Sequence, residues 1–135
     1  MAARISGVLS ALLIAAWCGV VRGEEMPAAE IERLGKLSGE VLLHAAVLKR
    51  LDALCPGGAG GDYTGEVERD AQRMPDDFQA AFALQQGTAQ KVGEFIARDF
   101  VKKGGGCSSE AVRKARLQAE ENHREALRHW RARGP

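Results

Sequence analysis

Aromatic residues are scarce in this sequence, which contains two Trp, one Tyr and four Phe among 135 residues. The buried surface must therefore come mainly from Leu, Val, Ile and Ala. The chain also has almost no net charge, because it contains 19 Lys and Arg and 18 Asp and Glu. Without a basic excess, the composition gives no sign of nucleic acid or an anionic membrane as the partner.

Several cofactor motifs are also missing. The three cysteines form no Cys-x-x-Cys pair, which excludes a thioredoxin-like redox motif and the attachment site of a c-type haem. No alternating run of β-branched residues occurs either, so strands are not expected. The chain is long enough for one modest core, and a single domain is expected.

Residues 1–23 have the three parts of a secretory signal peptide. Arg4 stands in a short polar start, an apolar run covers 5–21, and a Val-Arg-Gly sequence ends at Gly23. The run is shorter than the about 20 residues of a spanning helix and lacks a stop-transfer pattern. We therefore expect cleavage after Gly23, leaving residues 24–135 as a periplasmic or secreted domain without a membrane span.

Cys18 raises the question of a lipid anchor, because a cysteine that ends an apolar signal can be the lipidated first residue of a bacterial lipoprotein. The residue before it is Trp17. Its bulky ring stands where a small residue is normal, so the sequence does not favour lipidation of Cys18.

Cys55 and Cys107 are the two cysteines of the expected mature chain. Export to an oxidising compartment makes a disulfide the default for such a pair. Closing a loop of this length stabilises a small domain by about 4 kcal/mol in the chain-entropy model. A metal or redox pair is the rival interpretation, but no histidine lies near either cysteine in the sequence.

Helical periodicity is clearest between Pro27 and Leu54. Apolar residues recur there at spacings of three and four, which is typical of a helix with one buried stripe: Leu34, Leu37, Val41, Leu48 and Leu51. The helix is expected to end at 55–61, where a proline and four glycines favour a flexible loop. This loop lacks the lysine of a phosphate-binding P-loop.

Two further helices are expected before Cys107. Asp62 or Thr64 can cap a short second helix, and a third is expected from Pro75 or Asp76 to Lys103. Its predicted buried stripe consists of Phe78, Phe82, Ala89, Val92 and Ile96, and Phe95 and Phe100 are expected to widen the stripe near its end.

A fourth helix is expected from a cap at Ser108 or Ser109 to about Ala132. Its predicted buried face carries Val112, Ala115, Ala119, Ala126 and Trp130. The sequence thus predicts an all-α, four-helix bundle-like single domain with one disulfide.

The three histidines form no recognisable reactive constellation. His123 and His129 are six residues apart, not at the i, i+4 spacing of a helical zinc pair, and both are expected in solvent. His44 falls on the apolar stripe of the first helix, where a structural role is favoured over that of a catalytic base.

A cluster of acids in the fourth helix has a structural interpretation too. Glu120, Glu121 and Glu125 can pair at helical spacing with nearby bases, which are Arg116, Arg124 and Arg128. A charge-laced solvated face is therefore favoured over a pair of catalytic carboxylates. We expect no catalytic residue, no metal and no cofactor, and hence a protein that is not an enzyme.

Apolar residues outside the main stripes indicate a binding surface. Six such residues are surplus to a narrow stripe, namely Leu42, Leu43, Val47, Phe95, Phe100 and Leu117. Surplus apolar surface favours a groove for a partner helix. The alternative is that these residues complete a broad core stripe.

The order of helices and cysteines resembles the small helical pilotins of bacterial type II secretion. The resemblance covers roughly residues 30–112 and is carried by four segments: Leu34–Ser38 with the pattern Leu-x-x-Leu-Ser, Leu54–Cys55, Phe95–Asp99 with the sequence Phe-Ile-Ala-Arg-Asp, and Cys107–Glu110 with the sequence Cys-Ser-Ser-Glu. Pilotins are typically lipoproteins, and the poor lipidation site at Cys18 departs from that pattern.

This resemblance implies a fold, a disulfide and a partner. The matching cysteines, Cys55 and Cys107, would form the bridge, and a groove between helices would hold a C-terminal helix of an outer-membrane secretin subunit and escort it. The residues carried over by position as candidates for core or groove are Leu37, Val41, Leu48, Val92, Phe95 and Ile96.

Two other classes of binding protein remain open. A periplasmic immunity protein that inhibits a cell-wall hydrolase would use an exposed loop, for which 56–65 is the obvious candidate, with Asp62 and Tyr63 as contacts. A small periplasmic chaperone is the third interpretation, favoured by apolar surface without a defined groove. The sequence leaves the oligomeric state open.

Overall fold

A computed structural model describes residues 25–58 and 60–135 of the chain. Four α-helices follow one another in this part: α2 (Ala28–Leu54), α3 (Gly65–Gln72), α4 (Asp76–Gly104) and α5 (Glu110–Arg133). No strand occurs within it. The predicted all-α, bundle-like fold is therefore confirmed.

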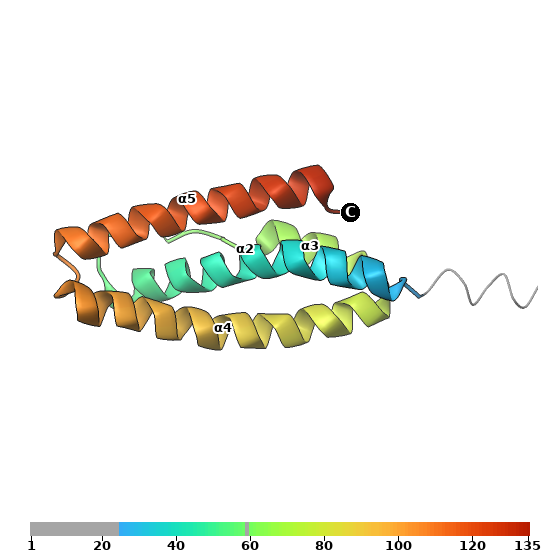
Figure 1. Ribbon diagram of the computed structural model, residues 1–135, viewed down its shortest axis with the longest axis horizontal. Helices are drawn as coiled ribbons and strands as arrows, with labels where there is room; N and C mark the ends of the chain where they lie inside the picture. The colour runs from blue at the N-terminus through green and yellow to red at the C-terminus, as the bar shows by residue number, and fades with distance from the viewer. Residues whose placement is uncertain (1–24, 59) are drawn as a thin grey trace, which may run out of the picture.

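Three long helices lie side by side along the long axis of the molecule, as Figure 1 shows. α2 lies between α4 and α5 and packs against both, whereas α4 and α5 contact each other sparsely. α2 and α4 run in the same direction and α5 runs back. Because the loop after α2 returns along the bundle to the short helix α3, the next helix, α4, can run parallel to its neighbour α2.

Local signals explain where the helices begin and end. The hydroxyl of Ser109 accepts a hydrogen bond from the backbone N–H of Val112 at 3.1 Å, which caps α5 as predicted. Asp62 accepts one from the N–H of Gly65 at 2.9 Å, at the start of α3. Gly105 follows α4 with a φ of 87°, a conformation that glycine adopts without strain.

The core consists of two clusters along the bundle. The larger cluster joins all four helices and contains Leu34, Val41, Leu42, Val67, Ala71, Met74, Phe78, Phe82, Ala89, Ala126 and Trp130. The smaller one, towards the disulfide, contains Val47, Leu48, Leu51, Ala97 and Ala119. The indole N–H of buried Trp130 donates to Asp70 at 2.8 Å, so its polar atom is satisfied.

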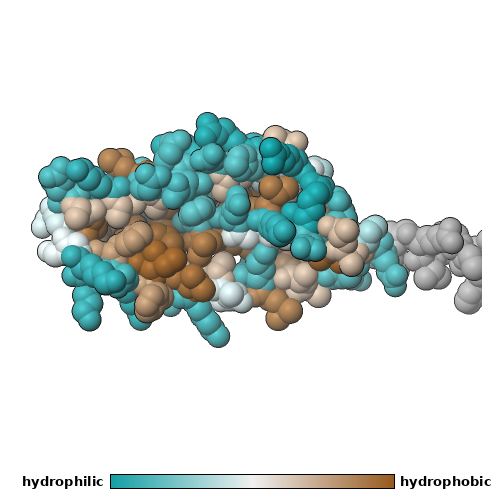
Figure 2. Space-filling model, in the orientation of Figure 1, coloured by the Kyte–Doolittle hydropathy of each residue, from teal (hydrophilic) through white to brown (hydrophobic). Residues whose placement is uncertain are grey.

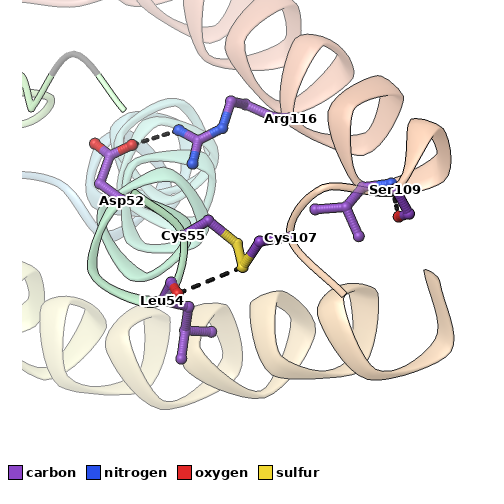
Figure 3. The surroundings of a disulfide bond; sticks show 7 residues. Asp52, Leu54, Cys55, Cys107, Ser109 and Arg116 are labelled. Atoms are coloured by element: carbon purple, nitrogen blue, oxygen red, sulfur yellow. Dashed lines mark hydrogen bonds and ion pairs between the residues drawn. A yellow bond between two sulfur atoms is a disulfide. The ribbon is translucent and has the colours of Figure 1, made fainter. Parts of the chain in front are cut away.

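The predicted disulfide is present between Cys55 and Cys107, with a Cα–Cα distance of 5.4 Å. It joins the end of α2 to the turn between α4 and α5 (Figure 3). Close by, the ion pair of Asp52 and Arg116 also connects α2 with α5. Two links of different chemistry therefore hold this end of the bundle together.

The buried stripe of α4 differs from the prediction in its second half. Phe78, Phe82 and Ala89 are buried as expected, but the stripe continues through Gly93 and Ala97 instead of Val92 and Ile96. The expected widening of the stripe by Phe95 and Phe100 was wrong, because both side chains are exposed. A Cβ atom added to Gly93 would lie 2.9 Å from the backbone carbon of Ala46 and 2.9 Å from the nitrogen of Val47. The helices approach so closely that only small residues fit between them.

Leu42 and Val47 complete a broad core stripe, which is the second of the two interpretations of the residues outside the main stripes. Both are buried, with 4 % of their surface exposed, because α2 packs against α4 on one side and α5 on another. A helix covered on two sides needs a broader apolar face than a single stripe.

The predicted signal peptide, residues 1–23, lies outside the described residues, and so does Cys18. Within the part that the structure describes, no helix is both long enough and apolar enough to cross a membrane.

Candidate functional site

The outer face of α4 exposes large apolar side chains. Leu84 is 78 % exposed, Phe95 72 % and Val92 42 %. Phe95 stands two residues from Gly93 and two from Ala97, and two residues turn a helix by about 200°, so its ring points away from the side that packs on α2. We call Leu84, Val92 and Phe95 the outer surface of α4.

Leu84 and Phe95 lie on one line along the helix, and Val92 lies to the side of that line. Leu84 and Phe95 are eleven residues apart, which corresponds to about three turns and about 17 Å along the axis. On the face shown in Figure 2, apolar side chains also gather over the C-terminal halves of α2 and α4. Large apolar residues in a row at helical spacing are the pattern that an approaching amphipathic helix requires.

The structure does not bring the six predicted partner-binding residues together on one surface. Val41 and Leu48 lie in the core, with 0 % and 1 % of their surface exposed. Leu37 is half-buried against the larger core cluster and Ile96 against the smaller one. Val92 and Phe95 are exposed on α4, so only part of the predicted set can touch a partner in this conformation.

Leu84 is the residue of the outer surface that sequence reasoning missed. It was not assigned to any stripe, although its spacing of eleven residues from Phe95 places both on the same side of a helix. Of the other surplus residues, Leu117 and Phe100 are exposed, by 63 % and 38 %.

A second surface is a groove of about 360 Å³ between α2, the segment before α3 and α4. Small side chains of α2 and α4, such as Ala46 and Ala89, line it together with Lys49 and Glu94. Arg50 also lines it, and its Nε is buried without a hydrogen-bond partner in the described part of the chain.

Tyr63 attaches the wall of this groove to the bundle. Its hydroxyl donates to Asp52 at 2.6 Å, and its ring meets the ring of His123 edge to face, with 5.4 Å between the centroids. Partial burial, followed by the hydrogen bond to Asp52, raises the pKa of Tyr63 to about 12. The predicted loop contact is therefore half-buried and held in place.

The surroundings of the histidines indicate structural roles. The prediction that His123 lies in solvent was wrong: it is 7 % exposed, and its Nε2 lies 2.8 Å from the carbonyl oxygen of Tyr63. His44 is half-buried between α2 and α5, and burial lowers its pKa, an effect that Glu40 opposes and His123 reinforces. His129 is within 3.9 Å of Glu40.

Two of the three bases predicted to pair with the acidic cluster of α5 do so within the helix. Glu121 lies 2.7 Å from Arg124 and 3.8 Å from Arg128. Arg116 instead pairs with Asp52 across the bundle. In the described ranges, no group of three or more His, Cys, Asp or Glu side chains is placed to hold a metal ion.

Comparison with other proteins adds no functional assignment. No protein-family model, curated protein sequence or solved structure matches this chain.

Proposed function

We propose that this protein is an exported, non-enzymatic binding protein that holds an amphipathic helix of another protein on the outer surface of α4. The observation that carries the proposal is Phe95, a ring 72 % exposed on a face that no helix of the described fold covers. Large exposed apolar residues in a row mark interaction sites in soluble proteins.

The size of this surface is sufficient for useful affinity. Burial of a large apolar side chain contributes about 1.5 to 3 kcal/mol before the costs of association. Burial of the three residues of the outer surface and of about three facing side chains of the partner would contribute about 9 to 18 kcal/mol before these costs, and a micromolar complex needs about 8 kcal/mol after them. An escort that must later release its cargo needs no tighter complex.

The finer proposal is a pilotin-like role in type II secretion, with the C-terminal helix of a secretin subunit as partner. It is supported by the resemblance in helix order and by the bridge between Cys55 and Cys107. Export itself rests on the signal-like sequence of residues 1–23.

The alternative of an immunity protein would depend on the loop around Tyr63. In this structure the hydroxyl of Tyr63 is engaged by Asp52 and its carbonyl by His123. To insert into a partner, Tyr63 would first have to lose both contacts, which favours the outer surface of α4 over the loop.

Photo-crosslinking in the producing cell tests the proposed function. A photoreactive phenylalanine analogue at position 95 should give a crosslinked partner. The same analogue at Arg128, an exposed position of α5, is the matched control and should give none. Crosslinks of equal yield from both positions, or from neither, would contradict a dedicated surface on α4.

A further inference from the structure

Three cations lie near Phe95 on the outer side of α4. Lys91, Arg98 and Lys102 lie four residues before, three after and seven after Phe95, which places all three on its side of α4. All three are exposed. Within residues 25–58 and 60–135, none of them lies within ion-pair distance of a carboxylate.

The other long helices carry both kinds of exposed base: in the described ranges Lys49 and Arg113 have no ion pair, whereas three others are paired. Lys36 on α2 pairs with Glu32, and on α5 Lys114 pairs with Glu110 and Arg124 with Glu121, each at a spacing of three or four residues. On α4, Asp99 pairs with Lys103 at 3.2 Å, and Glu94, the residue before Phe95, is in no ion pair within the described ranges. Three unpaired bases therefore outnumber the one unpaired acid, Glu94, and the surroundings of Phe95 combine an apolar centre with a net positive rim.

We infer that the helix bound by this surface is an acidic amphipathic helix, with apolar residues at i, i+3 or i+4 and i+7 flanked by Asp or Glu. This inference rests on the proposed function and specifies the partner's chemistry. The apolar residues of the partner would cover Phe95, Val92 and Leu84. Its carboxylates would meet the three unpaired cations, as charge complementarity at an interface rim requires.

Two other occupants fit the surface less well. A second copy of the chain would bring the same three cations to the contact and add repulsion. A membrane surface would favour a protein with a broad basic excess, whereas this chain carries nearly equal numbers of bases and acids. A narrow row along one helix is the shape that another helix complements.

Two synthetic helical peptides with the same apolar positions test the inference, one with Glu and the other with Lys at every flanking position. Protein purified after expression of the full 135-residue chain should bind the acidic peptide about tenfold more tightly than the basic one, by calorimetric titration. Raising the salt concentration should reduce this preference, because exposed charges are screened.

Three variants separate the contribution of the cations to peptide binding from that of the apolar anchor Phe95. The triple change Lys91→Gln, Arg98→Gln and Lys102→Gln should remove the preference. The matched control, Lys36→Gln, Lys114→Gln and Arg124→Gln, removes the same charge from paired bases elsewhere and should retain it. Phe95→Ser should weaken binding of both peptides by more than about tenfold, because the apolar anchor is lost.

Each contrary result has a distinct meaning. Equal binding of both peptides, lost in Phe95→Ser, would overturn the acidic partner and keep the helix-binding function. No binding of either peptide at about 1 mM would overturn both. Tighter binding to phosphatidylglycerol vesicles than to the acidic peptide would identify a membrane surface instead, and a dimer that Phe95→Ser converts to monomer would identify a second copy. Either of these outcomes overturns the inference.

Discussion

The two faces of the C-terminal half of α4 differ in the size of their apolar residues. The inner face passes Gly93 and Ala97 against α2, where the backbones nearly touch, whereas the outer face carries Phe95 into solvent. Both faces lack charge at these positions. In the C-terminal half of α4, close packing against α2 therefore selects small residues, and Phe95 remains available for a partner, whereas Phe78 and Phe82 in the N-terminal half are buried in the core.

Removing the disulfide should give the largest effect, because the bridge fixes the end of α2 that the inner face of α4 packs against. We expect the double change Cys55→Ala and Cys107→Ala to lower the free energy of unfolding by about 4 kcal/mol. Urea denaturation measures it, with the reduced wild-type protein as control. A loss below about 1 kcal/mol would mean that helix packing alone holds this end.

The same substitution on the two faces of α4 should have opposite effects. Gly93→Ala places a Cβ against the backbone of Ala46 and should destabilise the fold by about 2 kcal/mol. Gly87→Ala meets nothing within 4 Å and should stabilise it by about 1 kcal/mol through helix propensity. Thermal unfolding of both variants decides the point. Equal shifts of the unfolding temperature in the two variants would contradict the distinction between a packed and an open face of α4.

Tyr63 extends the comparison to the segment between α2 and α3. The folded-state pKa of about 12 exceeds the ordinary value of 10, so the neutral phenol is favoured by folding. Its contribution to stability is complete below pH 10 and is lost as the pH rises from 10 towards 12.

This shift can be observed directly, because Tyr63 is the sole tyrosine of the chain. Phenolate absorbance should titrate near pH 12 in the folded protein and near pH 10 in urea. Asp52→Asn removes the carboxylate acceptor and should lower the folded-state midpoint. A folded midpoint at 10 would indicate that the segment is not attached to the bundle.

Substitutions on the outer surface should have the smallest effect on stability. Phe95→Ser and Leu84→Ser remove side chains that are already exposed, so the free energy of unfolding should change by no more than about 0.5 kcal/mol. Circular dichroism during urea denaturation provides the measurement. A loss of more than about 2 kcal/mol from either variant would assign these residues to the fold instead of to binding.

The helices and their ends were predictable because their signals are local. Pro56 after α2, Ser109 before α5 and the glycines after α4 all act within a turn of the helix end. The disulfide was predictable without knowledge of the fold, because the expected export and the two cysteines of the expected mature chain favour a bridge.

The distribution of α4 residues between core and surface was less predictable. A stripe chosen by hydrophobicity selects Val92 and passes over Gly93, yet the close approach of α2 depends on the missing side chain of Gly93. The burial of His123 was missed for another reason. Its partner Tyr63 is 60 residues away and reaches it only because the loop after α2 returns across the bundle.

Intermolecular nuclear Overhauser effects test the central claim most directly, with the acidic helical peptide bound to the full-length protein. The ring protons of Phe95 and the methyl groups of Val92 and Leu84 should show contacts to the leucine methyl groups of the peptide, and the ring of Tyr63 should show none. Contacts of the peptide with Tyr63 and the groove residues, and none with Phe95, would contradict the assignment of binding to α4. They would favour the loop-based immunity protein.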